Sequence, residues 1–254
     1  MYFYKLRRCV RPTALTLILA LAACGTTPPP PAPAVAEPVA VPEPPPPPPP
    51  RILTLLTVPD PARFPVIDEA HPAKFFGSVG RLVASADANA KTAEFTAAAR
   101  HLNLRLGADV TASLEQALQR DGWLIHRIDV PRDRPDALLA DPTAYVGDGE
   151  AVLDVAIGSA GYQATTISDP YGPCVTVLAR LSSPAAPAVA LYTEQISYGS
   201  CAFPGYAALP APPGYRYDSY EDLALHDAAA VEGLRRAAAT LAQRIAPEVS
   251  RALP

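Results

Sequence analysis

The stretch that decides the fold is Cys174–Gly199, which reads "CVTVLARLSSPAAPAVALYTEQISYG". In its first half, apolar residues occupy every second position: Val175, Val177, Ala179 and Leu181. The turn-forming segment Pro184–Pro187 separates this half from "AVALYTEQISYG". Two such segments on either side of a short turn are typical of an antiparallel β-hairpin, so we expect a hairpin here.

Two further strands and a helix are predicted upstream of the hairpin. "AVLDVAIGSAGYQ" (151–163) carries alternating apolar residues on one face: Leu153, Val155 and Ile157. "WLIHRIDV" (123–130) alternates in the same way. "ADVTASLEQALQRDGW" (108–123) has apolar residues at helical spacing: Val110, Leu114, Ala117 and Leu118. We expect Asp109 or Thr111 to cap this helix and a left-handed Gly122 to end it.

The remaining segments complete a single globular domain over residues 51–254. "ILTLLTV" (52–58) is read as a short strand or a docking segment, "GSVGRLVAS" (77–85) as a possible strand and "TAEFTAAARHLNLRL" (92–106) as a helix. A closing helix is expected from Ser219 or Tyr220 to Ala246, capped by Ser219, with Pro247 ending or kinking it. The predicted class is α+β: two layers, a mostly antiparallel sheet with a β-hairpin, helices packed on one face, and a C-terminal helix.

Residues 1–23 have the pattern of a secretory signal peptide. "MYFYKLRRCVRP" is positively charged, and "TALTLILALAA" is apolar. That apolar run is much shorter than the roughly 20 residues that a membrane-spanning helix needs. The segment Leu21–Gly25, "LAACG", follows it at the position of a cleavage site.

The sequence Leu21-Ala22-Ala23-Cys24 resembles the lipobox of bacterial lipoproteins. In that family the cysteine thiol receives a diacylglyceryl group, cleavage precedes the cysteine, and the new amine is acylated, for example with palmitate. The resemblance implies that acyl chains on Cys24 anchor the protein to a membrane. Gly25 stands where an Asp would retain such a protein in the inner membrane, which implies the periplasmic face of the outer membrane. The alternative is an ordinary signal peptide with an incidental cysteine.

The segment 24–50 is a lipidated cysteine followed by a linker rich in proline, ending "VPEPPPPPPPR" at Arg51. Proline fixes φ and lacks an N–H, so this segment is expected to be polyproline II or disordered. At about 3.1 Å per residue it could reach roughly 80 Å. We interpret it as a stalk; a tolerated low-complexity tail and a ligand for a proline-binding domain are the alternatives.

The charge balance argues against nucleic-acid binding. Four of the 21 basic residues and none of the 25 acidic ones precede Cys24, so removal of residues 1–23 leaves 17 against 25, a net charge of −8. Affinity for nucleic acid depends largely on Lys and Arg contacts to phosphate, and no basic stripe is present.

The order of segments from Ala108 to Gly199 resembles a domain of small periplasmic lipoproteins. "SLEQALQRDGWLIHRIDV", "EAVLDVAIGS" and "VTVLARLSSPAAPAVALYTEQIS" follow the layout of the α/β domain shared by the curli-secretion lipoprotein, the TolB amino-terminal domain and the lipoprotein activators of penicillin-binding proteins. Members of this group bind proteins or assemble into complexes and are not enzymes. The loop 203–220 lies outside the shared pattern.

Two of the four cysteines are expected to form a disulfide. Cys9 would leave with the signal peptide and Cys24 would carry lipid, which leaves Cys174 and Cys201 in an oxidising compartment. Cys174 begins the first hairpin strand, and a turn at Gly199 would bring Cys201 back to it. Two free thiols are the alternative. A metal site would need a C-x-x-C pair or nearby histidines, and none is predicted.

No catalytic residue, metal or cofactor is predicted. The chain has no G-x-S-x-G and no phosphate-binding or dinucleotide-binding glycine motif, and its four histidines lack ligand spacing: His71, His101, His126 and His226. Five aromatic residues crowd one loop: Phe203, Tyr206, Tyr215, Tyr217 and Tyr220. They are either a binding surface or part of the core.

The expected function is therefore that of a non-enzymatic outer-membrane lipoprotein that presents a protein-interaction domain to a periplasmic or envelope protein, for example during cell-envelope assembly. An envelope enzyme or carbohydrate-binding module that uses the aromatic loop is a second hypothesis. A structural subunit that self-assembles through its sheet edge is a third. The sequence leaves the oligomeric state open.

Overall fold

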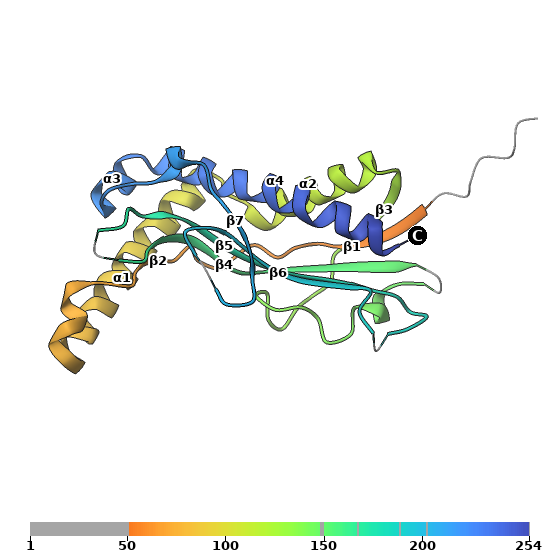
Figure 1. The fold of residues 1–254 in the computed structure, drawn as a ribbon, viewed down its shortest axis with the longest axis horizontal. Coiled ribbons are helices and arrows are strands. Elements are labelled where there is room, and N and C mark those ends of the chain that lie inside the picture. The colour runs from red at the N-terminus through yellow and green to blue at the C-terminus, as the bar shows by residue number, and fades with distance from the viewer. Residues whose placement is uncertain (1–50, 148–149, 167, 188, 202, 254) are drawn as a thin grey trace, which may run out of the picture. The chain divides into compact units, whose positions relative to one another are not determined.

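The computed structural model describes residues 51–253, apart from 148–149, 167, 188 and 202. The predicted signal peptide, Cys24 and the linker to Pro50 lie outside the described residues. The described part is an α+β fold of two layers, as predicted (Figure 1). Its seven-stranded sheet has the order β3-β1-β4-β5-β6-β7, and β2 pairs with the far part of β4.

The predicted hairpin is confirmed. β5 (Gly172–Ser182) and β6 (Tyr192–Gly199) are antiparallel, with Leu181 opposite Tyr192 and Cys174 opposite Gly199. β4 (Ala151–Ala164) pairs antiparallel with β5 along nearly its whole length. These three long strands make the sheet mostly antiparallel.

Four shorter strands join the sheet in parallel pairs. β1 (Arg51–Leu56) lies between β3 (Trp123–Ile128) and the start of β4, parallel to both. β2 (Val66–Asp68) is parallel to the end of β4, and β7 (Ala207–Leu209) is parallel to β6. The segment "ILTLLTV" is therefore an internal strand, and it is buried from Leu53 to Leu56.

The helices cover one face of the sheet, as predicted (Figure 1). They are α1 (Gly77–His101), α2 (Leu106–Arg120), the short α3 (Tyr220–Leu225) and α4 (Asp227–Ala252). Their inner faces and the facing strand residues form one continuous core, whose larger members include Leu53, Phe95, Leu114, Leu153, Tyr162, Val177, Ile196, Leu234 and Leu241.

Three local predictions are wrong at helix boundaries. Residues 77–85 form the start of α1 and not a strand, because no turn separates them from the helix-forming residues that follow. α2 begins at Leu106, so Asp109 and Thr111 lie inside its first turns and do not cap it. α4 continues through Pro247 to Ala252, and the break in the closing helix is at His226. Two other predictions are confirmed: Gly122 has φ +88°, and Ser219 Oγ accepts a hydrogen bond from Asp222 N.

Residues of the segment 129–147 pack on the other face of the sheet. Leu56, Val130 and Val152 form a small second core there. Asp154 of β4 is fully buried on this face, with Arg132 at 2.8 Å and Arg180 at 3.6 Å from its carboxylate, which also accepts a hydrogen bond of 2.8 Å from Leu139 N. A buried carboxylate is tolerated when it is paired in this way, and the pairing fixes the segment to the sheet.

Candidate functional site

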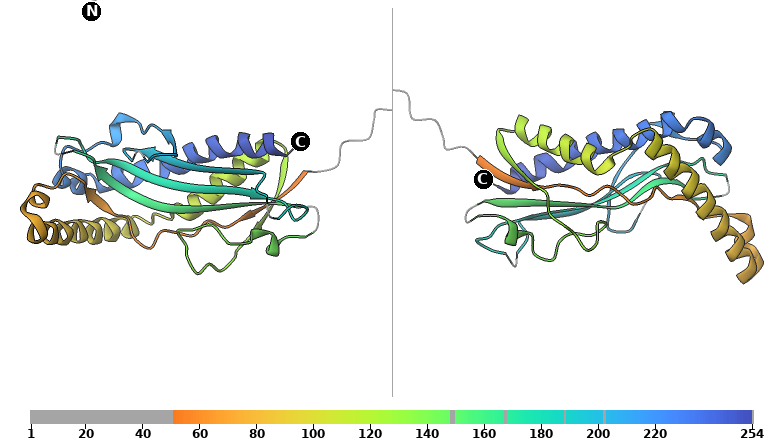
Figure 2. Two further views of the ribbon diagram at one scale, coloured as in Figure 1. Left: turned by 60° about the horizontal axis from the view of Figure 1, so that its bottom comes forward. Right: turned by 180° about the vertical axis from the view of Figure 1, so that it is seen from behind.

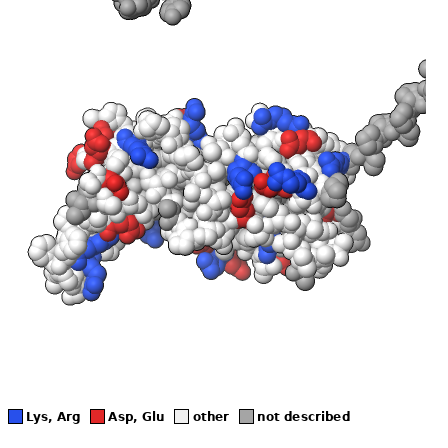
Figure 3. Space-filling model, in the orientation of Figure 1, with Lys and Arg blue, Asp and Glu red and all other residues white. Residues whose placement is uncertain are grey.

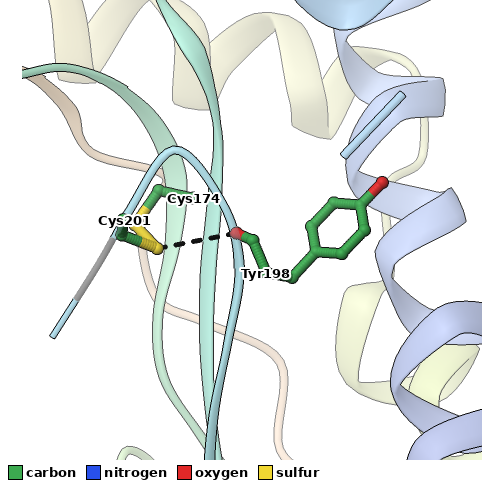
Figure 4. The surroundings of a disulfide bond; sticks show 3 residues. All are labelled: Cys174, Tyr198 and Cys201. Carbon is green, nitrogen blue, oxygen red and sulfur yellow. Dashed lines mark hydrogen bonds between the residues drawn. A yellow bond between two sulfur atoms is a disulfide. The ribbon is translucent and has the colours of Figure 1, made fainter. Parts of the chain in front are cut away.

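The aromatic loop begins at a disulfide, as predicted. Cys174 and Cys201 are bonded, with their Cα atoms 5.1 Å apart, and both are buried (Figure 4). Gly199, at φ +90°, makes the turn that returns the chain to β5, and Ser200 N donates to Pro173 O. Cys201 Sγ lies 3.5 Å from the carbonyl oxygen of Tyr198. The start of the loop is thus fixed to the sheet covalently.

Three of the five loop aromatics pack inward. Tyr217 is buried, its ring lies edge-on to Tyr162 at 5.7 Å, and its backbone pairs with that of Tyr171. The ring of Tyr215 lies against Gly233 of α4, so closely that a Cβ at Gly233 would be 2.9 Å from it. Tyr220 donates a 2.7 Å hydrogen bond to Glu94 of α1. These side chains hold the loop and α3 onto the helices.

The other two loop aromatics stay at the surface. Phe203 is exposed and Tyr206 is partly exposed, and their rings form a tilted pair with centroids 5.5 Å apart. The strand β7 follows directly and ends the sheet on this side. The predicted binding loop therefore offers one aromatic pair, and not a five-residue aromatic surface.

The two edges of the sheet differ in how well they are protected. β7 has three residues, and prolines stand on both sides of it at Pro204 and Pro210, which is how natural sheets discourage pairing at an edge. β3 has six residues and no proline. Its Leu124 is 56 % exposed and lies beside Ile52 of β1, which is 43 % exposed. No other strand of the described residues pairs with the outer edge of β3.

A second exposed surface, which sequence reasoning missed, lies at the start of α1. It consists of five apolar side chains that we call the α1 tip: Phe75, Phe76, Val79, Leu82 and Val83. The first two belong to a 3₁₀ turn, η1 (Pro72–Phe76), that leads into the helix. Figures 1 and 2 show this part of the chain projecting beyond the sheet. The helical spacing of residues 79, 82 and 83 indicates a helix, but it does not indicate that their side chains are exposed.

A charged cluster joins η1 to α1 beside the tip. Asp87 accepts from Lys91 at 2.6 Å and lies 3.5 Å from Nε2 of His71, whose Nδ1 accepts from Ala73 N. Burial by itself lowers the pKa of Lys91, but the hydrogen bond and charge of Asp87 hold that pKa above its ordinary value. Lys91 therefore stays charged and fixes the base of the tip.

The described residues contain no arrangement suited to metal binding or membrane spanning. No group of three or more His, Cys, Asp or Glu side chains among them could hold a metal ion. No helix in the same residues is long and apolar enough to cross a bilayer. His126 is exposed, 4.0 Å from Glu150, and His226 stacks on the ring of Tyr217.

No family model, curated protein or solved structure matches this chain. Its function is therefore argued from the geometry of its own surfaces.

Proposed function

We propose that this chain is a non-enzymatic lipoprotein, anchored through acyl chains on Cys24 to the periplasmic face of the outer membrane. Its Pro-rich stalk, residues 24–50, carries a domain that binds an extended segment of an envelope protein. The observation that supports this most directly is the open edge of β3, next to the strand that the stalk enters.

The β3 edge has the features of a β-augmentation site. An edge strand presents unpaired backbone N–H and C=O groups to a partner, and exposed side chains beside it supply specificity. The apolar pair Leu124–Ile52 offers such a contact on the face away from the helices. Natural sheets usually protect their edges with short strands, proline or charged side chains. β7 is short and flanked by proline, whereas β3 has six residues, no proline and one charged residue, Arg127.

The aromatic loop supports the second hypothesis less well. Carbohydrate-binding or catalytic use of the loop would need its aromatic rings at the surface, and Tyr215, Tyr217 and Tyr220 are used in packing. Phe203 and Tyr206 alone offer little enclosed surface to a sugar.

Two experiments test the proposal. The first compares the full protein with Cys24→Ala: the parent should incorporate labelled fatty acid and stay with membranes that are washed in high salt, and the variant should do neither. Equal retention of both proteins on salt-washed membranes would refute the lipid anchor.

The second experiment places a photo-crosslinking amino acid at His126 in β3 and, as a matched control, at the exposed Gln119 of α2. We expect a discrete protein adduct only from position 126, and we expect Leu124→Lys to abolish it while Leu225→Lys, on α3, leaves it. Absence of an adduct at 126, or the same adduct at 119, would contradict the docking site. An adduct of two copies of this chain would favour the self-assembly hypothesis instead.

A further inference from the structure

The α1 tip is a second apolar face on a helix that already has one. In the second half of α1, Phe95 and Ala99 face the core. At 3.6 residues per turn, these two positions lie about 160° and 200° around the helix from Val79. The apolar side chains of the first half therefore point away from the domain, so the core cannot account for them.

The size of the tip also sets it apart from scattered surface residues. Its five side chains are between 53 % and 78 % exposed, and Phe75 and Phe76 are the two at the apex. Two phenylalanines at this exposure present roughly 300 Å² of apolar surface. With Val79, Leu82 and Val83 the contiguous area exceeds the few hundred Å² usual on a monomer, which marks an interaction site.

The segment that carries the tip contains only basic charges, with Asp68, Glu69 and Asp87 just beyond its two ends. Lys74 and Arg81 flank it, and no Asp or Glu occurs from Ala70 to Ala86. This is unusual within residues 51–254, which hold 17 basic and 23 acidic residues, a net charge of −6. In the view of Figure 3 this end of the domain is white and blue, and the red surface begins nearer the sheet.

A hollow of about 320 Å³ adjoins the tip, and its charged lining residues are Asp68, Lys74, Arg81, Asp87 and Lys91. Lys91 is paired with Asp87, and Lys74 donates to the backbone oxygens of Asp68 and Glu69 and lies 3.8 Å from the Glu69 carboxylate. No carboxylate of the described residues is paired with Arg81, so Arg81 is the cation beside the tip that is left to contact an anion.

A second copy of the chain fits this surface poorly. Stable dimers bury about 800 Å² per partner, which is more than the tip offers. Packing two tips together would also bring Arg81 of both copies close to one another, with no carboxylate between Ala70 and Ala86 to offset it. The small apolar area and the charge of Arg81 therefore favour a lipid surface with anionic headgroups over a second copy.

We propose that the α1 tip binds peripherally to a lipid bilayer that contains anionic headgroups. Phe75, Phe76 and Leu82 would enter the boundary between headgroups and acyl chains, and Arg81 would contact lipid phosphates. An apolar helical face with aromatic residues and flanking cations is the usual composition of such interfacial segments. This contact requires neither acylation of Cys24 nor the β3 edge, and the start of α1 lies at the end of the domain opposite the start of β1 (Figure 2).

The test uses the chain from residue 24 onward carrying Cys24→Ser, which cannot be acylated; the core of residues 51–253 is internal, so the domain does not need residues 1–23 to fold. Flotation would be measured with vesicles of phosphatidylethanolamine and phosphatidylglycerol, and with phosphatidylcholine alone. We expect binding to the anionic vesicles that weakens as salt is added. The double variant Phe75→Ala, Phe76→Ala should bind at least about tenfold more weakly.

Three controls make the result decisive. Leu225→Ala removes an equally exposed side chain from α3 and should bind like the parent. Arg81→Gln should weaken the preference for anionic vesicles. Phe76→Trp adds a fluorophore at the tip, and its emission should shift to shorter wavelength on vesicle addition, while the buried Trp123 of the parent should not respond.

Several results would overturn the proposal. These are equal flotation of the parent and the double alanine variant, no binding to anionic vesicles, or no spectral shift from Phe76→Trp. A dimer in solution that the double alanine variant abolishes, without vesicle binding, would assign the tip to a second copy. Because the protein tested lacks acyl chains and keeps β3 intact, each of these results leaves the proposed function standing.

Discussion

Removal of the Cys174–Cys201 disulfide should cost the domain much of its stability. The cross-link closes a loop across a sequence separation of 27. In the chain-entropy model, a loop of this length restricts the unfolded chain by an amount worth about 3.5 kcal/mol at room temperature. For a domain of this size that loss corresponds to a fall in Tm of roughly 7–14 °C.

The measurement is urea denaturation, followed by circular dichroism, of the parent and of the double variant Cys174→Ala, Cys201→Ala. The midpoint should fall by about 1–2 M urea, and the m value should rise slightly because an uncross-linked chain unfolds to a more expanded state. The parent in strong reductant is the matched control, since it keeps both sulfur atoms but loses the bond. It should lose nearly as much stability as the double variant. A loss below about 1 kcal/mol in both would refute the loop-entropy reasoning.

Three further predictions concern the core. Asp154→Ala should destabilise the domain by about 3–5 kcal/mol in urea denaturation, because it leaves Arg132 buried without its carboxylate partner. The control Asp136→Ala removes an exposed partner of Arg134 and should cost less than about 1 kcal/mol. Gly161→Ala should lower the Tm strongly, since its Cβ would lie 1.9 Å from Pro65 O, and Gly214→Ala, with no atom within 4 Å, should not. Burial raises the pKa of Tyr162, Tyr192 and Tyr220 above the ordinary tyrosine value of about 10. The folded state therefore favours their neutral forms, and the stability that this contributes is complete below about pH 10 and is lost as the pH rises further. Unfolding above about pH 10 should therefore coincide with the rise in phenolate absorbance, and a domain that ionises these tyrosines without unfolding would contradict this.

The parts of the fold set by local patterns could be predicted from the sequence. The alternation in Val175–Leu181 and the proline-containing turn after it specify the hairpin, and counting cysteines left Cys174 and Cys201 to pair. The prediction of a strand at 77–85 was wrong because apolar residues at 79, 82 and 83 fit a short strand nearly as well as a helix. The absence of a turn before Thr92 decided between them.

The candidate sites depend on features that the sequence does not carry. An apolar residue is normally expected to be buried, so the pattern around Val79 and Leu82 gave no reason to expect exposure. Which strand ends a sheet is set by packing between distant segments, and Leu124 therefore looked like any other residue of an alternating strand. Asp154 within "AVLDVAIGS" was visible as a charge in an apolar run, but its partners Arg132 and Arg180 come from separate parts of the chain.

The position of β1 in the middle of the sheet bears on how the domain responds to force. A tension applied through the proposed stalk would reach the described domain at Arg51, the first residue of β1, whose neighbours on both sides are parallel to it. The hydrogen bonds of both ladders lie across the axis of β1, so a pull would shear them all at once and not open them one by one. The side chain of Arg51 adds two contacts at the start of the strand. Its guanidinium donates to Leu253 O at 2.7 Å and lies 4.6 Å above the ring of Trp123. The strand that follows the proposed stalk is therefore also well placed to resist being pulled out.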